Sequence, residues 1–333
     1  MSRGQDTLRA RLADPAPLSR EDADALVDGL ADVGVDEGLR RSWLLGLSAR
    51  AVRADELAAL AEAMRARAVP VSAPVEAVDS AGTGGDASHS VNRSTAAALV
   101  VASCGVPVVK HGNRAISGRC GSADVLEALG VPLAASAMQA EDQLARAGFT
   151  FLFAPTFHAA TRAIGPLRRA LGVPTAFNLL GPLTNPARPR VQLVGAASPG
   201  ASGAIAGALG ALGVRGAVVH GDNGWDEATP CSPWTRWGSD GSVGVEDAAG
   251  WGVSPCAAVA LAGGEPSMNA GILLRAFDGA RDGPAAGVFD AVRLQAALLL
   301  NLAGYPRDEA VTRATEALTS GSVRRVLSLL AAS

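Results

Sequence analysis

The sequence predicts an α/β fold in which a mainly parallel central sheet is flanked by helices and preceded by a small all-helical domain. Residues 1 to about 68 show helical periodicity alone. From residue 75 onward, β-rich runs alternate with helical patterns, which is typical of a parallel sheet covered by helices. The proline-containing stretch 69–74 interrupts both patterns and is the expected linker.

This linker sets the expected domain boundary. We assign residues 1–72 to a helical domain, which helices around 160–185 would complete, and residues 73–333 to the α/β domain. Ser19-Arg-Glu-Asp22 has the pattern of a capping box, so a helix should begin near residue 23. Two more helices are expected at 38–51 and 54–66, where apolar residues recur at helical spacing.

The α/β part should contain five clear strands and two weaker ones. The clear runs of β-forming residues are 75–79, 106–109, 150–153, 191–195 and 216–220, and the weaker ones are 235–237 and 242–245. Helical patterns cover 94–104, 122–129, 138–146, 201–212, 268–276 and about 289–303. The tail, 308–330, is expected to form one or two amphipathic helices.

The composition excludes several classes of function. Of the 333 residues, 48% are apolar and 18% are charged, so the chain can bury a large ordered core. A net charge of −3 and an aromatic content of 4% provide neither the basic surface nor the stacking platform of nucleic-acid binding. The chain shows no signal-peptide core, no membrane-length apolar run and no metal-ligand spacing among its four cysteines. We therefore expect a cytoplasmic protein without nucleic-acid or membrane partners.

A glycine-rich stretch at 79–95 joins an expected strand to an expected helix. Gly82, Gly84 and Gly85 lack Cβ atoms, so their N–H groups can approach a phosphate closely. The polar residues at 92–95 lie at the start of the helix, where free N–H groups and the positive dipole end favour an anion. The alternative for this stretch is a glycine turn followed by an ordinary N-cap.

A second candidate site follows the next expected strand, at 109–124. Lys110 is the only lysine in the chain. Apart from histidine, every other basic side chain is an arginine. Such a bias should retain lysine where a compact ammonium is needed, and Lys110 and Arg114 could contact phosphate oxygens. Asn113 could bind a carboxylate or an amine. A solvated basic turn is the alternative.

Two further motifs suggest an acidic substrate and a metal ion. Arg168 or Arg169, on an expected helix, could bind a substrate carboxylate, although a solvent-facing charge is the usual meaning of such a residue. Asp226 and Glu227 follow an expected strand, and adjacent carboxylates suit Mg²⁺ that bridges substrate phosphates. An acidic surface turn is the alternative to the metal site.

Together these motifs indicate one substrate that carries phosphates and a second that carries a carboxylate. Gly82-Thr-Gly-Gly-Asp-Ala does not match the dinucleotide fingerprint, and no P-loop motif occurs. The stretches GTGGD, NRST, KHGNRAISG, GSADVLEALG, FNLLGPLTNPA, the pair at 226–227 and LAGG occur in order along nearly the whole chain. With these motifs the sequence resembles the anthranilate phosphoribosyltransferase family.

The resemblance implies a reaction and a set of partners. The reaction transfers the ribosyl phosphate of 5-phosphoribosyl 1-diphosphate (PRPP) to the amine of anthranilate, in tryptophan biosynthesis, with Mg²⁺ and with release of diphosphate. A homodimer formed through the helical part is also implied. Mg²⁺, Lys110 and the loop N–H groups would stabilise the departing diphosphate. Lys110, His111 and His158 are candidate catalytic residues, but none is assigned as a base.

The resemblance also implies residue roles. PRPP-binding residues would be Gly82, Gly85, Asp86, Ser90, Asn92, Arg93, Ser94, Thr95, Lys110, His111, Gly112, Asn113, Arg114, Ala115, Ile116, Ser117, Gly118 and Ser122. Anthranilate would contact Gly82, Asn113, His158, Arg168 and Pro182. Ser94, Asp226 and Glu227 would be the Mg²⁺ ligands.

The chain also departs from the family pattern. Arg93 stands where an apolar residue is usual, and Gln295 stands where asparagine is common. Ala159 and Thr161 replace the usual proline and bulky residue after His158, which keeps open the transfer of phosphoribosyl to another aromatic acid. A pyrimidine nucleoside phosphorylase would show Lys-His-Ser in place of residues 110–112. A non-catalytic binding protein on the same fold would not need Lys110, Asp226 and Glu227.

Overall fold

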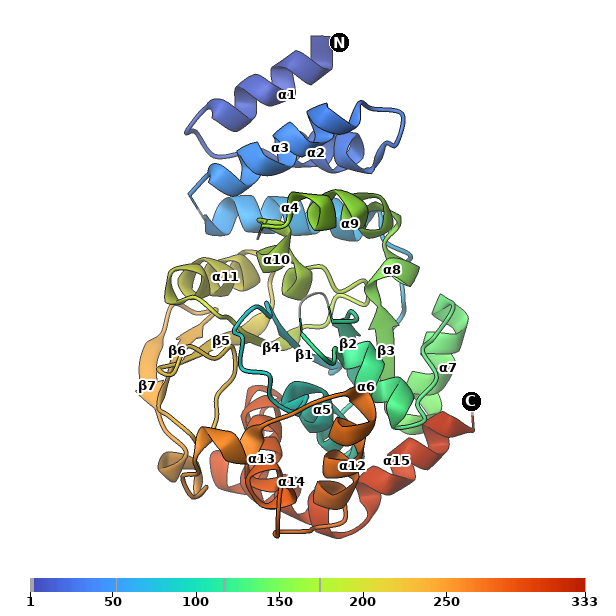
Figure 1. Cartoon of the computed structure of the whole chain (residues 1–333), viewed down its shortest axis with the longest axis vertical. Helices are drawn as coiled ribbons and strands as arrows, with labels where there is room; N and C mark the ends of the chain where they lie inside the picture. The colour runs from blue at the N-terminus through green and yellow to red at the C-terminus, as the bar shows by residue number, and fades with distance from the viewer. Residues whose placement is uncertain (1–2, 52, 116–117, 174, 333) are drawn as a thin grey trace.

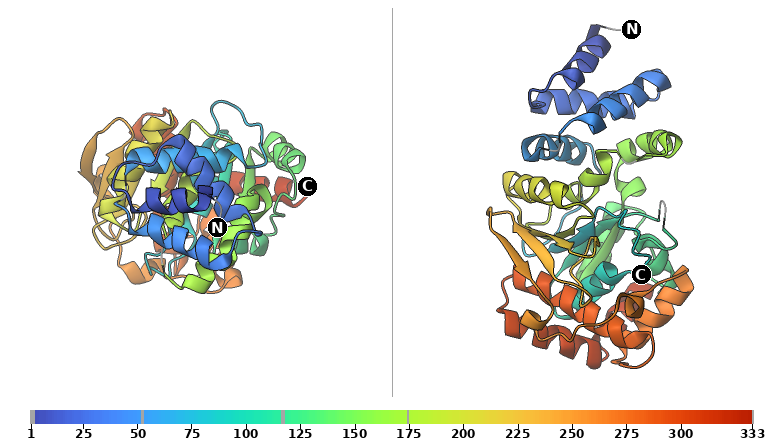
Figure 2. Two further views of the ribbon diagram at one scale, coloured as in Figure 1. Left: turned by 90° about the horizontal axis from the view of Figure 1, so that it is seen from above. Right: turned by 60° about the vertical axis from the view of Figure 1, so that its left-hand side comes forward.

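A helical segment forms one end of the molecule, and a sheet flanked by helices forms the other (Figure 1). The computed structural model describes residues 3–51, 53–115, 118–173 and 175–332. The two parts are stacked along the longest axis, and the N-terminus lies at the far end of the helical part (Figures 1 and 2).

The helical part combines four N-terminal helices with three from the middle of the chain. They are α1 (Arg3–Ala13), α2 (Arg20–Ala31), α3 (Glu37–Ala49), α4 (Ala54–Ala66), α8 (Ala154–Phe157), α9 (Ala159–Leu171) and α10 (Phe177–Leu180). Helix α9 packs against α2 and α3. Its buried Ile164 and Leu167 join one apolar core with Leu26, Trp43 and Leu60. Buried residues of α9 and α10 thus pack with the N-terminal helices, whereas the boundary at residue 72 stays a prediction.

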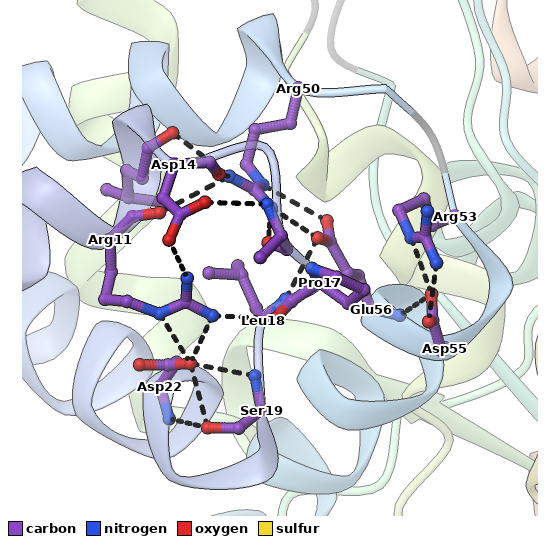
Figure 3. A network of polar contacts seen from close by, with 12 residues as sticks. Arg11, Asp14, Pro17, Leu18, Ser19, Asp22, Arg50, Arg53, Asp55 and Glu56 are labelled. Atoms are coloured by element: carbon purple, nitrogen blue, oxygen red, sulfur yellow. Dashed lines mark hydrogen bonds and ion pairs between the residues drawn. The ribbon is translucent and has the colours of Figure 1, made fainter.

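A buried ion pair fixes the end of α1 against α4 (Figure 3). Arg50 donates to Glu56 at 2.6 Å and to the backbone oxygens of Arg11, Leu12, Asp14 and Ala16. Glu56 also accepts from the backbone N–H of Leu18 at 3.0 Å. These contacts satisfy carbonyl groups that the end of α1 leaves free. The predicted capping box is confirmed, because the Ser19 and Asp22 side chains each bind the other's backbone N–H.

The sheet has seven strands in the order β3-β2-β1-β4-β5-β6-β7. The strands are β1 (Val78–Gly82), β2 (Val108–Gly112), β3 (Phe149–Phe153), β4 (Val191–Gly195), β5 (Arg215–Gly221), β6 (Trp234–Gly238) and β7 (Val243–Glu246). The first five are parallel, whereas β6 and β7 are antiparallel to their neighbours. The predicted α/β class with a mainly parallel sheet is therefore confirmed, and both weak runs are strands.

Helices cover both faces of the sheet. They are α5 (Arg93–Ser103), α6 (Ser122–Ala128), α7 (Ala137–Ala147), α11 (Pro199–Ala211), α12 (Pro266–Phe277), α13 (Ala285–Leu302), α14 (Arg307–Thr319) and α15 (Ser322–Ala331). Alternate strand residues enter different cores, since Leu193 joins the core of α5 and α13 and Val194 joins that of α11 and α4. Short 3-10 turns lie at Gly181–Leu183, Ala249–Trp251 and Ala258–Leu261.

Two predicted strands are displaced in the structure. Strands β1 and β2 begin two to three residues later than predicted and extend three residues further, to Gly82 and Gly112. Residues before β1 form a turn closed by the Ala77 N–H and the Pro74 carbonyl at 3.0 Å. The prediction ended the second strand before Lys110, but Lys110 and His111 pair with Phe151 and Leu152 of β3, and their side chains are buried.

One helix among the described residues, α13, is long and apolar enough to cross a membrane by length and composition. It lies within the protein, with 78% of its residues buried. A core helix of a soluble protein has the same character, so α13 is a core element.

Candidate functional site

The site lies at the topological switch point of the sheet, where the strand order reverses. From β1 the chain continues to β2 and β3 on one side, whereas β4 and β5 lie on the other side of β1 (Figure 1). The carboxyl ends of two such strands leave a crevice in which α/β proteins bind ligands. Gly82 and Gly195 are paired in register at these ends of β1 and β4.

The acidic loop, residues 222–229, crosses this point. The Asp226 carboxylate accepts a hydrogen bond from the Gly84 N–H at 2.8 Å. A Cβ on Gly82 would lie 2.7 Å from Asp226 Oδ2, and one on Gly195 would lie 1.5 Å from the Asp226 carbonyl oxygen. The strand ends are therefore glycine because the acidic loop contacts their backbones directly.

The glycine-rich loop that follows β1 has unusual backbone angles. Gly84, Gly85, Ala87 and His89 all have positive φ, between 47° and 81°. Asp86 accepts from the Ser88 N–H at 3.1 Å and, through its other oxygen, from the Asp226 N–H at 3.4 Å. Residues 261–263 bind the far end of the loop, at 89–91, by backbone hydrogen bonds of 2.9 to 3.0 Å. The exposed N–H groups of such a loop suit an anion.

The start of α5 binds the acidic loop through Glu227. The Ser94 N–H donates to Glu227 Oε1 at 3.1 Å, and Arg93 Nε donates to Glu227 Oε2. The carboxylate thus stabilises the positive end of α5. Thr95 is fully buried, and its hydroxyl has no partner among the described residues. The Asn92 side chain is bound on both sides, to the Cys120 carbonyl and to Asn269.

The carboxylates of the acidic loop suit Mg²⁺, which takes few protein ligands, better than they suit a metal ion that needs a complete set of protein ligands. The residues that the structure describes contain no group of three or more His, Cys, Asp or Glu side chains able to hold a metal ion. Mg²⁺ commonly takes one or two carboxylates and completes its shell with water and phosphate oxygens. Burial, with the nearby Glu227 and Asp86 carboxylates, raises the pKa of Asp226 to about 8. The surroundings of Asp226 therefore disfavour its ionised form, which a bound cation would stabilise.

Lys110, in β2, lies near the carboxylates of the acidic loop. Its side chain is 1% exposed, and its ammonium donates to the Ser80 carbonyl of β1. Burial lowers the pKa of Lys110, whereas the Asp79, Glu227 and Asp226 carboxylates oppose this shift. The only lysine and the two adjacent acids thus belong to one site.

A buried polar cluster, which the sequence analysis missed, supports these residues from within the sheet. Asp79 is fully buried and accepts from Asn185 at 2.9 Å, Gln192 at 3.1 Å and the His111 N–H at 3.3 Å. Burial raises the pKa of Asp79, and Lys110 is the largest influence in the opposite direction. A charge within the apolar run 75–79 and a glutamine within β4 were the available signals.

The segment after β2 is organised by Asp124 in α6. One oxygen of this side chain accepts from the N–H groups of Ala115 and Gly121 at 3.1 and 2.8 Å. Arg114 forms ion pairs with Asp124 and Glu127 at 2.9 and 2.6 Å. Its guanidinium is therefore already bound by carboxylates, and its expected phosphate contact stays a prediction. The other predicted residues here, Gly112, Asn113, Gly118 and Ser122, are half-buried or exposed, and Ile116 and Ser117 lie outside the described residues.

Three of the residues expected to bind the acid lie around α9, α10 and the turn at Gly181–Leu183, namely His158, Arg168 and Pro182. His111 and His158 have ring centroids 5.2 Å apart, and His111 Nδ1 lies 3.3 Å from the Gly181 carbonyl. Burial lowers the pKa of His111 to about 3 and that of His158 to about 4, so both rings are neutral at pH 7. Pro182 is buried beside them and accepts from Gln192 through its carbonyl oxygen.

Arg168 is a further cation on this side of the site. It donates to the Asn178 side chain at 3.1 Å, and burial lowers its pKa. It forms no ion pair with a carboxylate of the described residues, so it can accept an external one. Asn178, which the sequence analysis did not single out, orients Arg168 and also binds the Thr175 N–H at 3.0 Å.

The structure brings most of the predicted residues into two adjoining groups. The first contains Gly82, Gly85, Asp86, Ser90, Ser94, Thr95, Lys110, Asp226 and Glu227 around the ends of β1 and β4. The second contains His111, His158, Arg168 and Pro182 and reaches the first through β2. The arrangement can bind a phosphorylated, metal-associated group beside a carboxylate-bearing one.

The chain matches two family models in sequence. Residues 7–68 match the helical bundle domain of the glycosyl transferase family, and residues 74–324 match its a/b domain. An anthranilate phosphoribosyltransferase of Novosphingobium aromaticivorans is 42% identical over 324 residues, which cover 95% of this chain and 97% of the relative.

Solved structures show the same likeness. Anthranilate phosphoribosyltransferase from Thermus thermophilus superposes with a TM-score of 0.91 at 38% identity and covers 99% of both chains. The enzyme from Saccharomyces cerevisiae in complex with PRPP and Mg has a TM-score of 0.90 at 25% identity, covering 99% of this chain and 97% of the yeast chain. The yeast enzyme in complex with 4-fluoroanthranilate has a TM-score of 0.85 at 26% identity, covering 98% and 97%.

Proposed function

Because the chain belongs to the anthranilate phosphoribosyltransferase family, we propose that the residues at the carboxyl ends of β1 and β4 carry out the family's reaction. The protein transfers the 5-phosphoribosyl group of PRPP to the amino group of anthranilate and releases diphosphate, a step of tryptophan biosynthesis (EC 2.4.2.18). The roles of its individual residues, its metal ion and its oligomeric state are our proposals.

One observation carries the assignment of the site. The acidic loop lies directly on the glycine ends of β1 and β4, with Lys110 beneath it and the glycine-rich loop beside it. This arrangement joins a glycine-rich loop, one ammonium and two carboxylates at the place where α/β sheets bind ligands. The yeast relative is solved with PRPP and Mg, which supports the same ligands here.

In our proposal Asp226 and Glu227 hold Mg²⁺ with Ser94, and the ion when bound neutralises negative charge on the diphosphate. The glycine-rich loop, through N–H groups such as that of Gly85, and residues at the start of α5 bind phosphate oxygens in this proposal. Lys110, through the charge of its buried ammonium, favours negative charge above the sheet. These groups stabilise the departing diphosphate more strongly as its charge develops, which lowers the barrier.

Anthranilate would bind on the other side, with its carboxylate on Arg168. Asn113, Pro182 and the neutral His111 and His158 would form the walls of this pocket. A weakly basic aromatic amine needs correct placement at the sugar carbon more than it needs a strong base. The neutral rings therefore position the acceptor in this proposal.

We also propose that the protein is a cytoplasmic homodimer formed through its helical part, as the family resemblance implies. Light scattering of the purified protein tests the dimer directly. The expected mass is twice the 33.4 kDa of one chain. A mass of one chain at micromolar concentration would contradict the dimer without affecting the assignment of the site.

The acceptor is tested by incubating the protein with PRPP, Mg²⁺ and a panel of aromatic amino acids. We expect loss of anthranilate fluorescence together with equimolar diphosphate release. Ala159 and Thr161 lie beside the acceptor residues, so close analogues of anthranilate belong in the panel. Release of diphosphate with another acid in preference to anthranilate would contradict our acceptor assignment.

The metal assignment is tested by combining Asp226→Asn with Glu227→Gln. We expect a loss of turnover of about 100-fold or more that added Mg²⁺ does not restore, because the ligands are gone. Asp240→Asn, in the exposed turn between β6 and β7, is the control for a carboxylate elsewhere. Full Mg²⁺-dependent activity in the double variant would remove both residues from the metal site.

A further inference from the structure

Two long polar side chains hold the acidic loop from the core side of the molecule. Arg93 begins α5 and Gln295 lies within α13, and these two helices pack against each other beneath the sheet (Figure 1). Arg93 is 1% exposed and Gln295 is 2% exposed, although both emerge from an apolar core. Buried polar side chains of this size are retained where they have partners.

Their partners are consecutive parts of the acidic loop. Arg93 Nε donates to Glu227 Oε2, and the guanidinium carbon lies 4.9 Å from the centre of the Trp225 ring. Gln295 Nε2 donates to the carbonyl of Ala228 at 3.0 Å. The two side chains therefore fix the backbone and the carboxylate of the loop before any ligand binds.

Each oxygen of Glu227 accepts one hydrogen bond from the start of α5. Arg93 binds one oxygen and the Ser94 N–H binds the other, at 3.1 Å. A free dication would have to compete with a buried guanidinium and lie near its positive charge. Asp226 differs, because it forms no ion pair with an arginine or lysine of the described residues.

We propose that Arg93 is a positioning residue that serves as a built-in cation for Glu227 and thereby weakens the binding of a divalent ion to the free protein. The positive charge of Arg93 already neutralises Glu227. The diphosphate therefore supplies the negative charge that binds the ion. This inference rests on the proposed assignment of Asp226 and Glu227 to the metal site. It gives Arg93 a role behind the acidic loop, away from PRPP itself.

The first test measures Mn²⁺ binding to the full-length protein without PRPP, by the loss of the free Mn²⁺ signal in electron paramagnetic resonance. Arg93→Met removes the competing charge, and we expect Mn²⁺ to bind about tenfold more tightly than to the unchanged protein. Arg93→Lys, which keeps the charge, should bind within about twofold of the unchanged protein. Equal or weaker binding by Arg93→Met would overturn the proposal.

Two further variants separate charge from packing. Arg93→Gln keeps a donor towards Glu227 but carries no charge, so it should tighten Mn²⁺ binding in the same direction even if the methionine variant does not fold. Arg40→Met is the control, because Arg40 is also buried, at 7% exposure, and lies in the helical part. A gain in the Arg40 variant equal to that at Arg93 would show that the effect is unspecific.

The last comparison separates this proposal from the metal assignment. The gain from Arg93→Met should disappear when Glu227→Gln is added, because the freed carboxylate is its source. Asp226→Asn should weaken Mn²⁺ binding in every background. If Asp226→Asn has no effect, the metal assignment fails; if it weakens binding but Arg93→Met does not tighten it, only the role of Arg93 fails.

Discussion

The charged side chains of the site lie close to one another. Lys110 lies among Asp79, Asp226 and Glu227, and Arg93 is paired with Glu227. A buried charge is stable only with such partners. Arg168 is the exception, since its only described partner is the neutral Asn178.

This exception leads to a prediction for Arg168→Ala. We expect the KM for anthranilate to rise about 10- to 100-fold with a smaller change in the KM for PRPP, because a carboxylate contact is lost. Arg169→Ala is the matched control, since Arg169 is the exposed neighbour on the same helix. Steady-state kinetics with each substrate varied separately provide the measurement. A change in the KM for PRPP alone would show that Arg168 does not bind anthranilate.

The two buried histidines predict how stability depends on pH. Burial lowers the pKa of His158 to about 4, below the value of about 6.5 expected in the unfolded chain. The unfolded state therefore binds more protons between these values, so stability is complete above pH 6.5 and falls as the pH drops towards 4.

His158→Asn should remove part of this dependence. We expect the loss of unfolding free energy between pH 7 and pH 5 to be about 2 kcal/mol smaller than in the unchanged protein. Urea titrations at both pH values provide the measurement, and the exposed His89, changed to Asn, is the control. The same acid dependence in the His158 variant and the unchanged protein would contradict this account.

At the scale of elements, the site depends on how closely the acidic loop approaches two strand ends. The loop leaves β5, returns in β6 and places Asp226 on the last residues of β1 and β4. The glycine-rich loop and α5 bind it through Gly84 and Ser94. The backbones of these elements therefore approach one another closely. Only glycine at positions 82 and 195 leaves room for Asp226.

Gly195→Ala tests this contact. The added methyl group would lie 1.5 Å from the Asp226 carbonyl oxygen, so the acidic loop must move. We expect at least about 2 kcal/mol of lost stability, and about 100-fold or more lost activity as the metal ligands shift. Gly200→Ala, with its nearest atom at 3.8 Å within α11, should instead be neutral or slightly stabilising. A Gly195 variant with normal stability and activity would contradict the proposed contact.

At the scale of the whole molecule, the helical part and the sheet share one core. Ile205 and Leu209 of α11 are fully buried in the cluster that contains Leu57 and Leu60 of α4 and Val218 of β5. The helices approach closely, since a Cβ on Gly207 would lie 2.8 Å from the Ala54 methyl group. The helical part is therefore a required cover for this face of the sheet.

Deletion of residues 1–68 should consequently expose the apolar surface of α9 and α11. Each large apolar side chain exposed costs about 1.5–3 kcal/mol, so we expect the remaining chain to aggregate or to lose cooperative unfolding. Size-exclusion chromatography and thermal unfolding monitored by circular dichroism provide the measurements, with the full chain as the reference. A monomeric fragment that unfolds cooperatively would show that the two parts are independent.

The sequence alone determined the fold class and the order of the strands along the chain, and it supplied the proposed residues of the site. The alternation of β-rich and helical runs predicted the parallel sheet, and β4 was predicted to the residue at 191–195. The only lysine and the adjacent acids indicated a phosphate and metal site because such chemistry requires particular residue types.

Only the tertiary structure decided which residues reach one another. Polar residues ended the predicted strands at 79 and 109, whereas the folded chain buries Asp79 and Lys110 against Asn185, Gln192 and the Ser80 carbonyl. The pairing of Arg93 with Glu227 joins residues 134 positions apart. Local patterns carry the preferences of a segment for helix or strand, but the burial and pairing of charges depend on contacts between distant segments, which form only when the chain folds.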